Sequence, residues 1–178
     1  MSSIISNYLA RWSVCIVFGL IAVLMFTVLV PSGVNEITVN RTLAPQILDE
    51  YYPTWTAQQA QKLFSSLGDS GRSAYRQFYL KLDFWFPVLS LSIFYSSLLS
   101  LSFSQNSRFK RLNLLPVGMY FFDMAENINH FSMAGSYPDL PAAQLFFGPL
   151  LTLMKYVLIT GLPILALVGF VVKRRKIA

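Results

Sequence analysis

Four long apolar stretches constrain the fold of this 178-residue chain more than any other feature. They cover about residues 12–30, 84–103, 114–133 and 145–172. A helix of about 20 apolar residues crosses the hydrocarbon core of a bilayer, and a segment in lipid must satisfy its own backbone hydrogen bonds. We therefore expect an all-α fold, a four-helix transmembrane bundle that forms a single integral membrane domain over residues 1–178.

The composition supports a membrane protein and argues against other classes. Charged residues make up 12% of the chain, about half the share in a typical soluble domain. The net charge of +6 comes from short basic clusters beside apolar runs, which is typical of loops that flank membrane spans and not of a nucleic-acid-binding surface. Cys15 and His130 are the only residues of their types. Neither a disulfide framework nor a cysteine- or histidine-rich metal site is therefore expected, and no cofactor is predicted.

The first stretch allows two interpretations, a cleaved signal peptide or an uncleaved anchor. Its apolar run, WSVCIVFGLIAVLMFTVLV, is longer than the apolar core of a typical signal peptide. No small-x-small cleavage motif follows it. We therefore interpret it as an uncleaved signal anchor.

The distribution of lysine and arginine predicts the orientation, because basic residues favour the cytoplasmic side in short loops. They gather at Arg11, between the second and third stretches (Arg108, Lys110, Arg111) and in the tail (Lys173, Arg174, Arg175, Lys176). The short loop between the third and fourth stretches carries a single charge, Asp139. Both termini are therefore expected in the cytoplasm, in a plasma or inner membrane.

The segment between the first two stretches, about residues 31–83, is predicted to lie outside and to contain a helical hairpin that caps the bundle. Thr56 and Gln59 have the spacing of a capping box, and Gly68 is a typical helix stop. A second helix would follow and run into the second stretch, where Pro87 can introduce a kink. The alternative is a loop without fixed structure. Four aromatic residues in and beside this segment suit the membrane–water interface: Tyr51, Tyr52, Trp55 and Trp85.

The third stretch carries polar residues inside an apolar run. Asp123, Glu126, Asn127 and His130 fall within an arc of about 100° on a helix, because each residue turns the helix by about 100°. Phe121, Phe122, Ala125 and Ile128 fall on the opposite side. Since lipid cannot satisfy a polar face, this stripe must face the interior of the bundle or a wet cavity.

The second and fourth stretches offer partners for this stripe. The fourth carries Gln144, Gly148 and Lys155 near one meridian, with Thr152 close by, and Asp83 begins the second at the predicted outer rim. With a rise of about 1.5 Å per residue, Asp123 lies about 13 Å from the inner end of its helix and Lys155 about 15–18 Å from the outer end. Both are near the midplane, so we predict an Asp123–Lys155 ion pair at the base of a polar column that opens outward.

Glu126 adds a second acid, so this pair alone does not balance the buried charge. A proton on one carboxyl, His130, Arg76, a bound ion or a cationic ligand could provide the balance. The cluster itself has three interpretations: a structural network that fixes the helix register, a site for a ligand, substrate or ion, or a docking point for a partner subunit.

Two motifs resemble a group of small four-span membrane proteins. The first is G-R-x-x-Y followed by D-x-x-F-P, and the second is D-x-x-E-N. The resemblance covers about half of the chain and implies a helical bundle with an external loop, without implying an activity. The matching residues are Gly71, Arg72, Tyr75, Asp83, Pro87, Asp123, Glu126 and Asn127.

Three classes of function fit these observations. The first is a non-catalytic membrane protein, either an accessory subunit or homo-oligomer or a binder of a lipid or other small molecule at an outward-opening polar site. The second is a membrane-embedded enzyme that uses Asp123 or Glu126 with His130 for acid–base chemistry. The third is proton- or cation-coupled transport, for which intramembrane carboxylates are typical.

Overall fold

The computed structural model describes residues 8–37, 47–83, 87–103 and 108–175, and all regular structure within these ranges is helical. This confirms the all-α fold. The principal elements in chain order are α2 (Trp12–Leu24), the π-helical turn η1 (Met25–Leu29), α3 (Val30–Ile37), the 3₁₀ turn η2 (Leu48–Glu50), α4 (Ala57–Phe78), the π-helical turn η3 (Tyr79–Asp83), α5 (Pro87–Ser102), the 3₁₀ segment η4 (Arg108–Leu114), α6 (Leu115–Ser136) and α7 (Ala142–Arg175).

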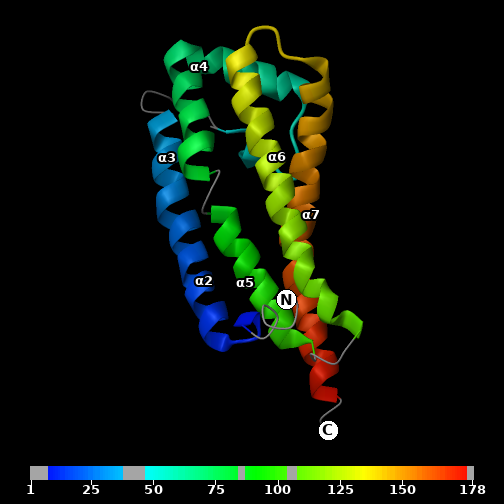
Figure 1. Cartoon of the computed structure of the whole chain (residues 1–178). Coiled ribbons are helices and arrows are strands. Elements are labelled where there is room, and N and C mark those ends of the chain that lie inside the picture. Colours follow the sequence, from blue (N-terminus) through cyan, green and yellow to red (C-terminus); the bar gives the residue numbers. More distant parts are fainter. Residues whose placement is uncertain (1–7, 38–46, 84–86, 104–107, 176–178) are drawn as a thin grey trace.

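By length and composition, three helical stretches are long and apolar enough to cross a membrane: Trp12–Ile37, Ala142–Arg175, and Ala57–Ser102, of which residues 84–86 are outside the described ranges. α6 has the length of a span but not the same apolarity, because it carries the polar stripe. It nevertheless packs along α7 within the bundle (Figure 1). The start of α2 and the end of α7 lie at the same end of the molecule (Figure 1), while the tail residue Lys176 lies outside the described residues.

The first helical run is longer than the predicted 12–30 because the chain passes through Pro31 without breaking. A proline inside a helix removes one hydrogen bond and clashes with the carbonyl four residues earlier. Here the turn before it, Met25–Leu29, is π-helical, and the Val30 N–H donates to the Met25 carbonyl five residues back. The wider turn lets the helix continue to Ile37.

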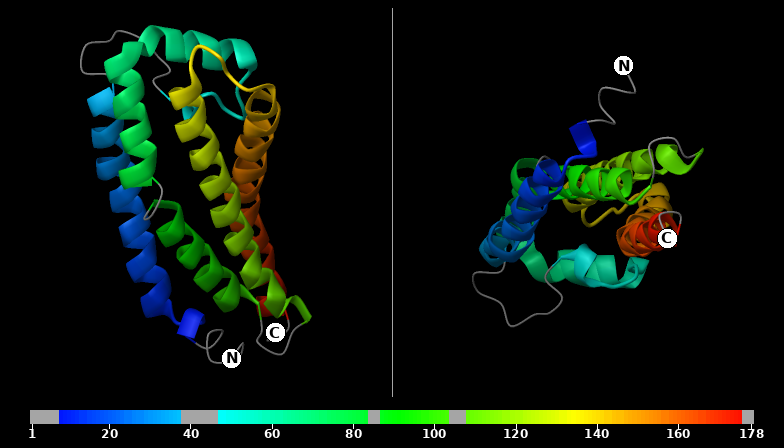
Figure 2. Two further views of the ribbon diagram at one scale, coloured as in Figure 1. Left: turned by 45° about the horizontal axis from the view of Figure 1, so that its top comes forward. Right: turned by 90° about the horizontal axis from the view of Figure 1, so that it is seen from below.

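α4 consists of two arms that meet at Gly68. The capping box of Thr56 and Gln59 is present at its start, which confirms that prediction. Gly68 has φ +60° and ψ −180°, a conformation that is essentially restricted to glycine. The first arm lies across the end of the bundle, and the second turns down beside α3 (Figures 1 and 2).

The second arm of α4 is therefore part of the bundle and does not lie above it as the hairpin prediction expected. Phe78 packs so closely on Gly33 of α3 that a Cβ atom there would lie 2.8 Å from its ring. This contact gives a physical reason for the position of the second arm: Phe78 would be exposed if the arm lay above the bundle, and it is buried when the arm packs on α3.

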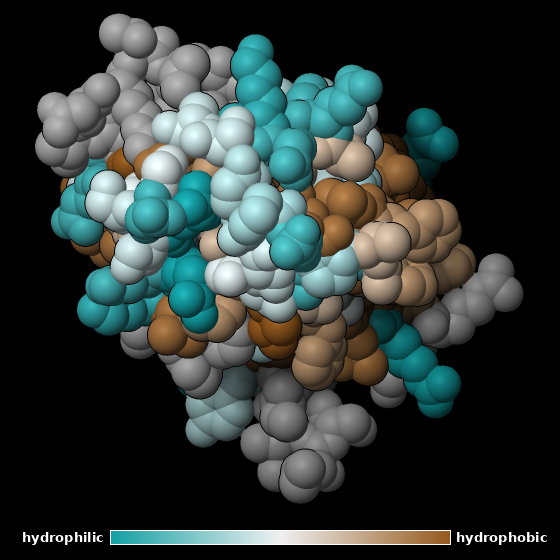
Figure 3. All heavy atoms as spheres, turned by 90° about the horizontal axis from the view of Figure 1, so that it is seen from above, coloured by the Kyte–Doolittle hydropathy of each residue, from teal (hydrophilic) through white to brown (hydrophobic). Residues whose placement is uncertain are grey.

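The molecule has a polar end and apolar flanks. Seen from the end that α4 covers, the centre of the surface is mainly hydrophilic, with hydrophobic residues toward one edge (Figure 3). The sides of α2, α6 and α7 expose large apolar residues, among them Ile16, Leu20, Val23, Phe121, Ile128, Ile164 and Leu167. Such extensive exposed apolar surface is typical of a membrane-facing side.

Two apolar clusters lie along the bundle with the polar residues between them. The cluster near α4 includes Trp55, Phe64 and Tyr75. The cluster toward the other end includes Met119 and Leu162. The polar stripe of α6 lies between these two clusters, because Met133 of α6 belongs to the first and Met119 of α6 to the second. The stripe therefore has apolar packing on both sides along the bundle axis.

Candidate functional site

The polar stripe of α6 faces the interior of the bundle. Asp123, Glu126, Asn127 and His130 are at most 1% exposed, whereas Ile128 on the opposite side is 57% exposed. This is the orientation that the helical spacing predicts. It leaves four polar side chains in a region where each needs a protein partner.

Lys155 of α7 supplies a positive charge to three carboxylates. Its Nζ atom forms ion pairs with Glu126 Oε2 and Asp49 Oδ1, and it lies 3.4 Å from Asp123 Oδ1. The predicted Asp123–Lys155 pair is therefore present. It is the longest of the three, so Asp123 is not the main partner of the lysine.

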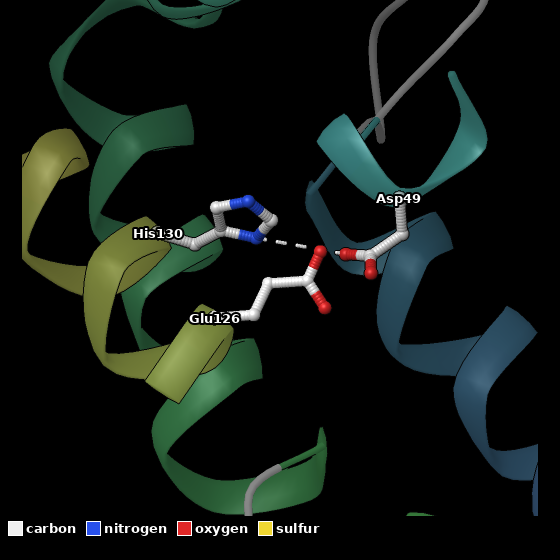
Figure 4. A group of neighbouring side chains, drawn as sticks. All are labelled: Asp49, Glu126 and His130. Atoms are coloured by element: carbon white, nitrogen blue, oxygen red, sulfur yellow. Dashed lines mark ion pairs between the residues drawn. The ribbon is translucent and has the colours of Figure 1, made fainter. Parts of the chain in front are cut away.

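Asp49 is the residue that the sequence did not reveal. It lies on η2, in the segment expected outside the membrane, yet its side chain reaches the cluster. Tyr79 donates a hydrogen bond to its Oδ2 atom, Tyr156 donates to its backbone carbonyl at 2.6 Å, and His130 Nδ1 lies 3.6 Å from Oδ2. Figure 4 shows the side chains of Asp49, Glu126 and His130 pointing toward one another.

Asp49 is held in its ionised form by its neighbours. The ammonium group of Lys155 pairs with Oδ1 and the Tyr79 hydroxyl donates to Oδ2, so each oxygen has a partner that stabilises the carboxylate. No periodicity could have found Asp49, because η2 is a single turn in an irregular segment. Its role depends on how the loop folds back between α4 and α7.

Glu126 is anchored by a hydrogen-bond chain that ends at a tryptophan. Thr152 donates to Glu126 Oε1, and the indole Nε1 of Trp55 donates to Thr152 Oγ1 at 3.0 Å. Trp55, which the sequence predicts at the membrane interface, is 1% exposed, and its N–H has a partner inside the bundle. Gly148 makes room for it, because a Cβ there would lie 2.5 Å from its ring. Trp85 lies outside the described residues.

Asp83 lies at the end of η3 and not at the outer rim. It is buried, interacts with Asn127 and is close enough to Asp123 for their charges to influence each other. Asn127 in turn donates to Asp123 Oδ2 at 3.3 Å. The position differs from the prediction because the second arm of α4 carries Asp83 down into the bundle.

Gln144 is separate from the charged cluster. Its side-chain amide donates to Ser132 Oγ at 2.7 Å, and its backbone carbonyl accepts a hydrogen bond from Asn129 at 3.4 Å. It therefore joins α6 to α7 nearer the α4 end. Arg76, a predicted source of compensating charge, instead stacks over the Phe131 ring at 4.3 Å.

The cluster borders a cavity of about 560 Å³. Its charged lining comprises Asp49, Glu50, Asp83, Asp123 and Lys155. Much of the remaining lining is apolar and comes from the first helical run, α5 and α7, including Phe26, Val30, Val34, Val88, Leu91 and Ile159. The site thus combines a largely apolar pocket with a charged patch.

Comparison with known proteins returned no match: no family model, no curated protein and no solved structure matches this chain. The resemblance of its motifs to small four-span membrane proteins therefore stays a prediction. The chemistry of the site must therefore be inferred from its geometry. Its most distinctive property is that acidic side chains outnumber basic ones. Within the described cluster, four carboxylates surround one lysine: Asp49, Asp83, Asp123 and Glu126 around Lys155.

Proposed function

We propose that this protein is a non-catalytic, multi-pass membrane protein that binds an amphipathic small molecule or lipid inside its bundle. In this proposal α6 is a fourth span, both termini are cytoplasmic, and the end covered by α4 faces outward. The observation that carries the proposal is the cavity of about 560 Å³ with apolar walls and a charged patch.

The size and lining of the cavity define the class of ligand. Sites for small molecules typically have volumes of about 300–1,000 Å³, apolar walls and a few polar groups that orient the ligand. Four carboxylates against one lysine favour a polar head that is cationic or rich in hydrogen-bond donors. The expected ligand therefore has an apolar body and a basic or hydroxyl-bearing head.

The surroundings of the cavity favour binding over transport. Beyond Lys155 the inward face of α7 continues with Leu158, Ile159 and Leu162, which pack in the apolar cluster with Met119. Coupled transport requires access from both sides in turn. On α5 this half of the bundle also holds buried serines, but Ser100 and Ser102 donate to backbone carbonyls of their own helix and Asn113 donates to Ser100. These internal hydrogen bonds, together with the apolar cluster, support a site that is closed toward the end where α7 terminates.

Native mass spectrometry of the protein purified in mild detergent, followed by extraction and identification of bound compounds, tests the proposal. Wild-type protein should retain one amphipathic compound per chain. Ile159→Trp places a large side chain in the cavity and should abolish this retention. The matched control is Ile164→Trp on the same helix, where the native side chain is 63% exposed, and it should retain the compound. A wild-type protein without ligand, or equal retention in both variants, would contradict the proposal.

A further inference from the structure

The side chains of Asp49 and Glu126, which both pair with Lys155, also converge on His130 (Figure 4). One carboxylate oxygen from each acid and one imidazole nitrogen all lie within 4.8 Å of one another. The three side chains come from two separate parts of the chain, η2 and α6. Small shifts would bring these atoms to the separations found around one metal ion.

The distance between His130 and Asp49 is informative. His130 Nδ1 and Asp49 Oδ2 are 3.6 Å apart, which is too long for a hydrogen bond. Two ligands bound to one ion at about 2.0–2.2 Å, with a roughly tetrahedral angle between them, are separated by about 3.3–3.5 Å, close to the observed distance. The observed separation therefore fits two ligands of one ion better than a donor–acceptor pair.

His130 is an unpartnered polar side chain aimed into this cluster. It is fully buried, and neither ring nitrogen has a hydrogen-bond partner among the described residues. The rings of Tyr79 and Trp55 enclose it at centroid distances of 5.0 and 5.8 Å. A buried polar group without a partner is costly, and an unseen ion is one of the few physical reasons for it.

The two carboxylates are already oriented by hydrogen bonds from outside the triad. Tyr79 donates to Asp49 Oδ2, and Thr152 donates to Glu126 Oε1. Such outer hydrogen bonds typically hold metal-binding carboxylates in position. Lys155 pairs with Asp49 Oδ1 and Glu126 Oε2, so the oxygens left for an ion are Asp49 Oδ2 and Glu126 Oε1, the two that accept these outer hydrogen bonds.

The charge balance of the cluster also favours a bound cation. If its four carboxylates are ionised, Lys155 leaves an excess of three negative charges, and a divalent cation would neutralise two of them. We propose that Asp49, Glu126 and His130 bind a divalent first-row transition-metal ion such as Zn²⁺ or Mn²⁺. One imidazole with two carboxylates is a ligand set of this class.

The test uses full-length, tag-free protein in detergent with Cys15 replaced by alanine. Co²⁺ serves as a spectroscopic probe, and the metal content after Zn²⁺ loading and desalting is measured by mass spectrometry. The wild-type site should bind about one ion and give the visible absorption of bound Co²⁺. His130→Gln should weaken binding at least tenfold, whereas Asp139→Asn, which removes an exposed acid, should leave binding unchanged.

A second variant covers the case in which His130→Gln fails to fold. His130→Cys keeps a ligand atom at this position and should add a thiolate-to-cobalt charge-transfer band to the spectrum. Absence of Co²⁺ and Zn²⁺ binding in the wild-type protein, or a Co²⁺ spectrum that is the same in the wild type and His130→Cys, would overturn the metal site. A protein that binds no metal but retains an amphipathic ligand would refute the metal site and leave the proposed function standing.

Discussion

Lys155 is the residue on which the buried charges depend. A lone ammonium group near the centre of a bilayer is costly, and three carboxylates around Lys155 offset this cost. The reverse also holds, because Glu126 is fully buried and the Asp49 side chain is only 16% exposed, and both lose their counter-charge when the lysine is removed.

Lys155→Met should therefore lower the free energy of unfolding by about 3–5 kcal/mol, the usual cost of leaving one member of a buried ion pair unpaired. A denaturant titration in detergent micelles measures this. Adding Glu126→Gln should restore more of the loss than adding Asp123→Asn, because Glu126 lies closer to the lysine. Lys81→Met, which removes an exposed lysine, should change stability by less than about 0.5 kcal/mol. Equal restoration by the two second substitutions would contradict this ranking.

Two glycines of α7 allow a matched comparison of packing at the site. A Cβ at Gly148 would lie 2.5 Å from the Trp55 ring, whereas a Cβ at Gly161 would meet no atom within 4 Å. Gly148→Ala should displace Trp55 and the Asn129 amide, which a Cβ would approach to 2.3 Å, and destabilise the protein by about 1–3 kcal/mol, as overpacking does. Gly161→Ala should be neutral or stabilising by up to about 1 kcal/mol, because alanine favours a helix over glycine. Thermal unfolding in detergent, followed by Trp fluorescence, measures both, and similar effects at the two positions would contradict the packing of Trp55 on Gly148.

At the scale of elements, the conformation of Gly68 determines the path of α4. Its φ of +60° with ψ of −180° lets the first arm lie across the bundle while the second descends beside α3. Gly68→Ala should cost about 1–3 kcal/mol of stability, because side chains rarely adopt this backbone conformation. Gly118→Ala in α6, where a Cβ would meet open space, is the control and should not destabilise the protein. Denaturant titrations of the two variants in the same detergent provide the test, and a neutral Gly68→Ala would show that the kink does not need glycine.

The elements that could be predicted from sequence are those specified by local pattern. The capping box at Thr56, the helix stop at Gly68 and the inward face of α6 depend only on residue type and spacing, and each is present. Asp49 and the depth of Asp83 depend on how distant segments pack. An isolated turn such as η2 has no period, so its burial against α6 and α7 could not be inferred from the sequence.

At the scale of the whole molecule, the polar groups are distributed unevenly along the bundle. The end covered by α4 is mainly hydrophilic (Figure 3), the charged cluster lies below it, and the apolar cluster around Met119 and Leu162 follows. The opposite end carries the basic residues of the α7 terminus. The positive-inside rule predicts that this basic end faces the cytoplasm.

Cysteine labelling in intact cells tests that orientation. The single native cysteine is replaced in Cys15→Ala, and one new cysteine is introduced by Gln61→Cys on the first arm of α4 or by Arg174→Cys at the end of α7. Both native side chains are exposed. A membrane-impermeant maleimide should label the Gln61→Cys protein on intact cells, and it should label the Arg174→Cys protein only after permeabilisation.

The expected labelling follows from the number of times that the chain crosses the bilayer between Gln61 and Arg174. The start of α2 and the end of α7 lie at the same end of the molecule, opposite to the first arm of α4 (Figure 1). If α6 crosses the bilayer with the three apolar runs, these two ends face opposite sides of the membrane. Labelling of both positions from the same side would exclude α6 as a span, and with it the arrangement that places the charged cluster inside the membrane.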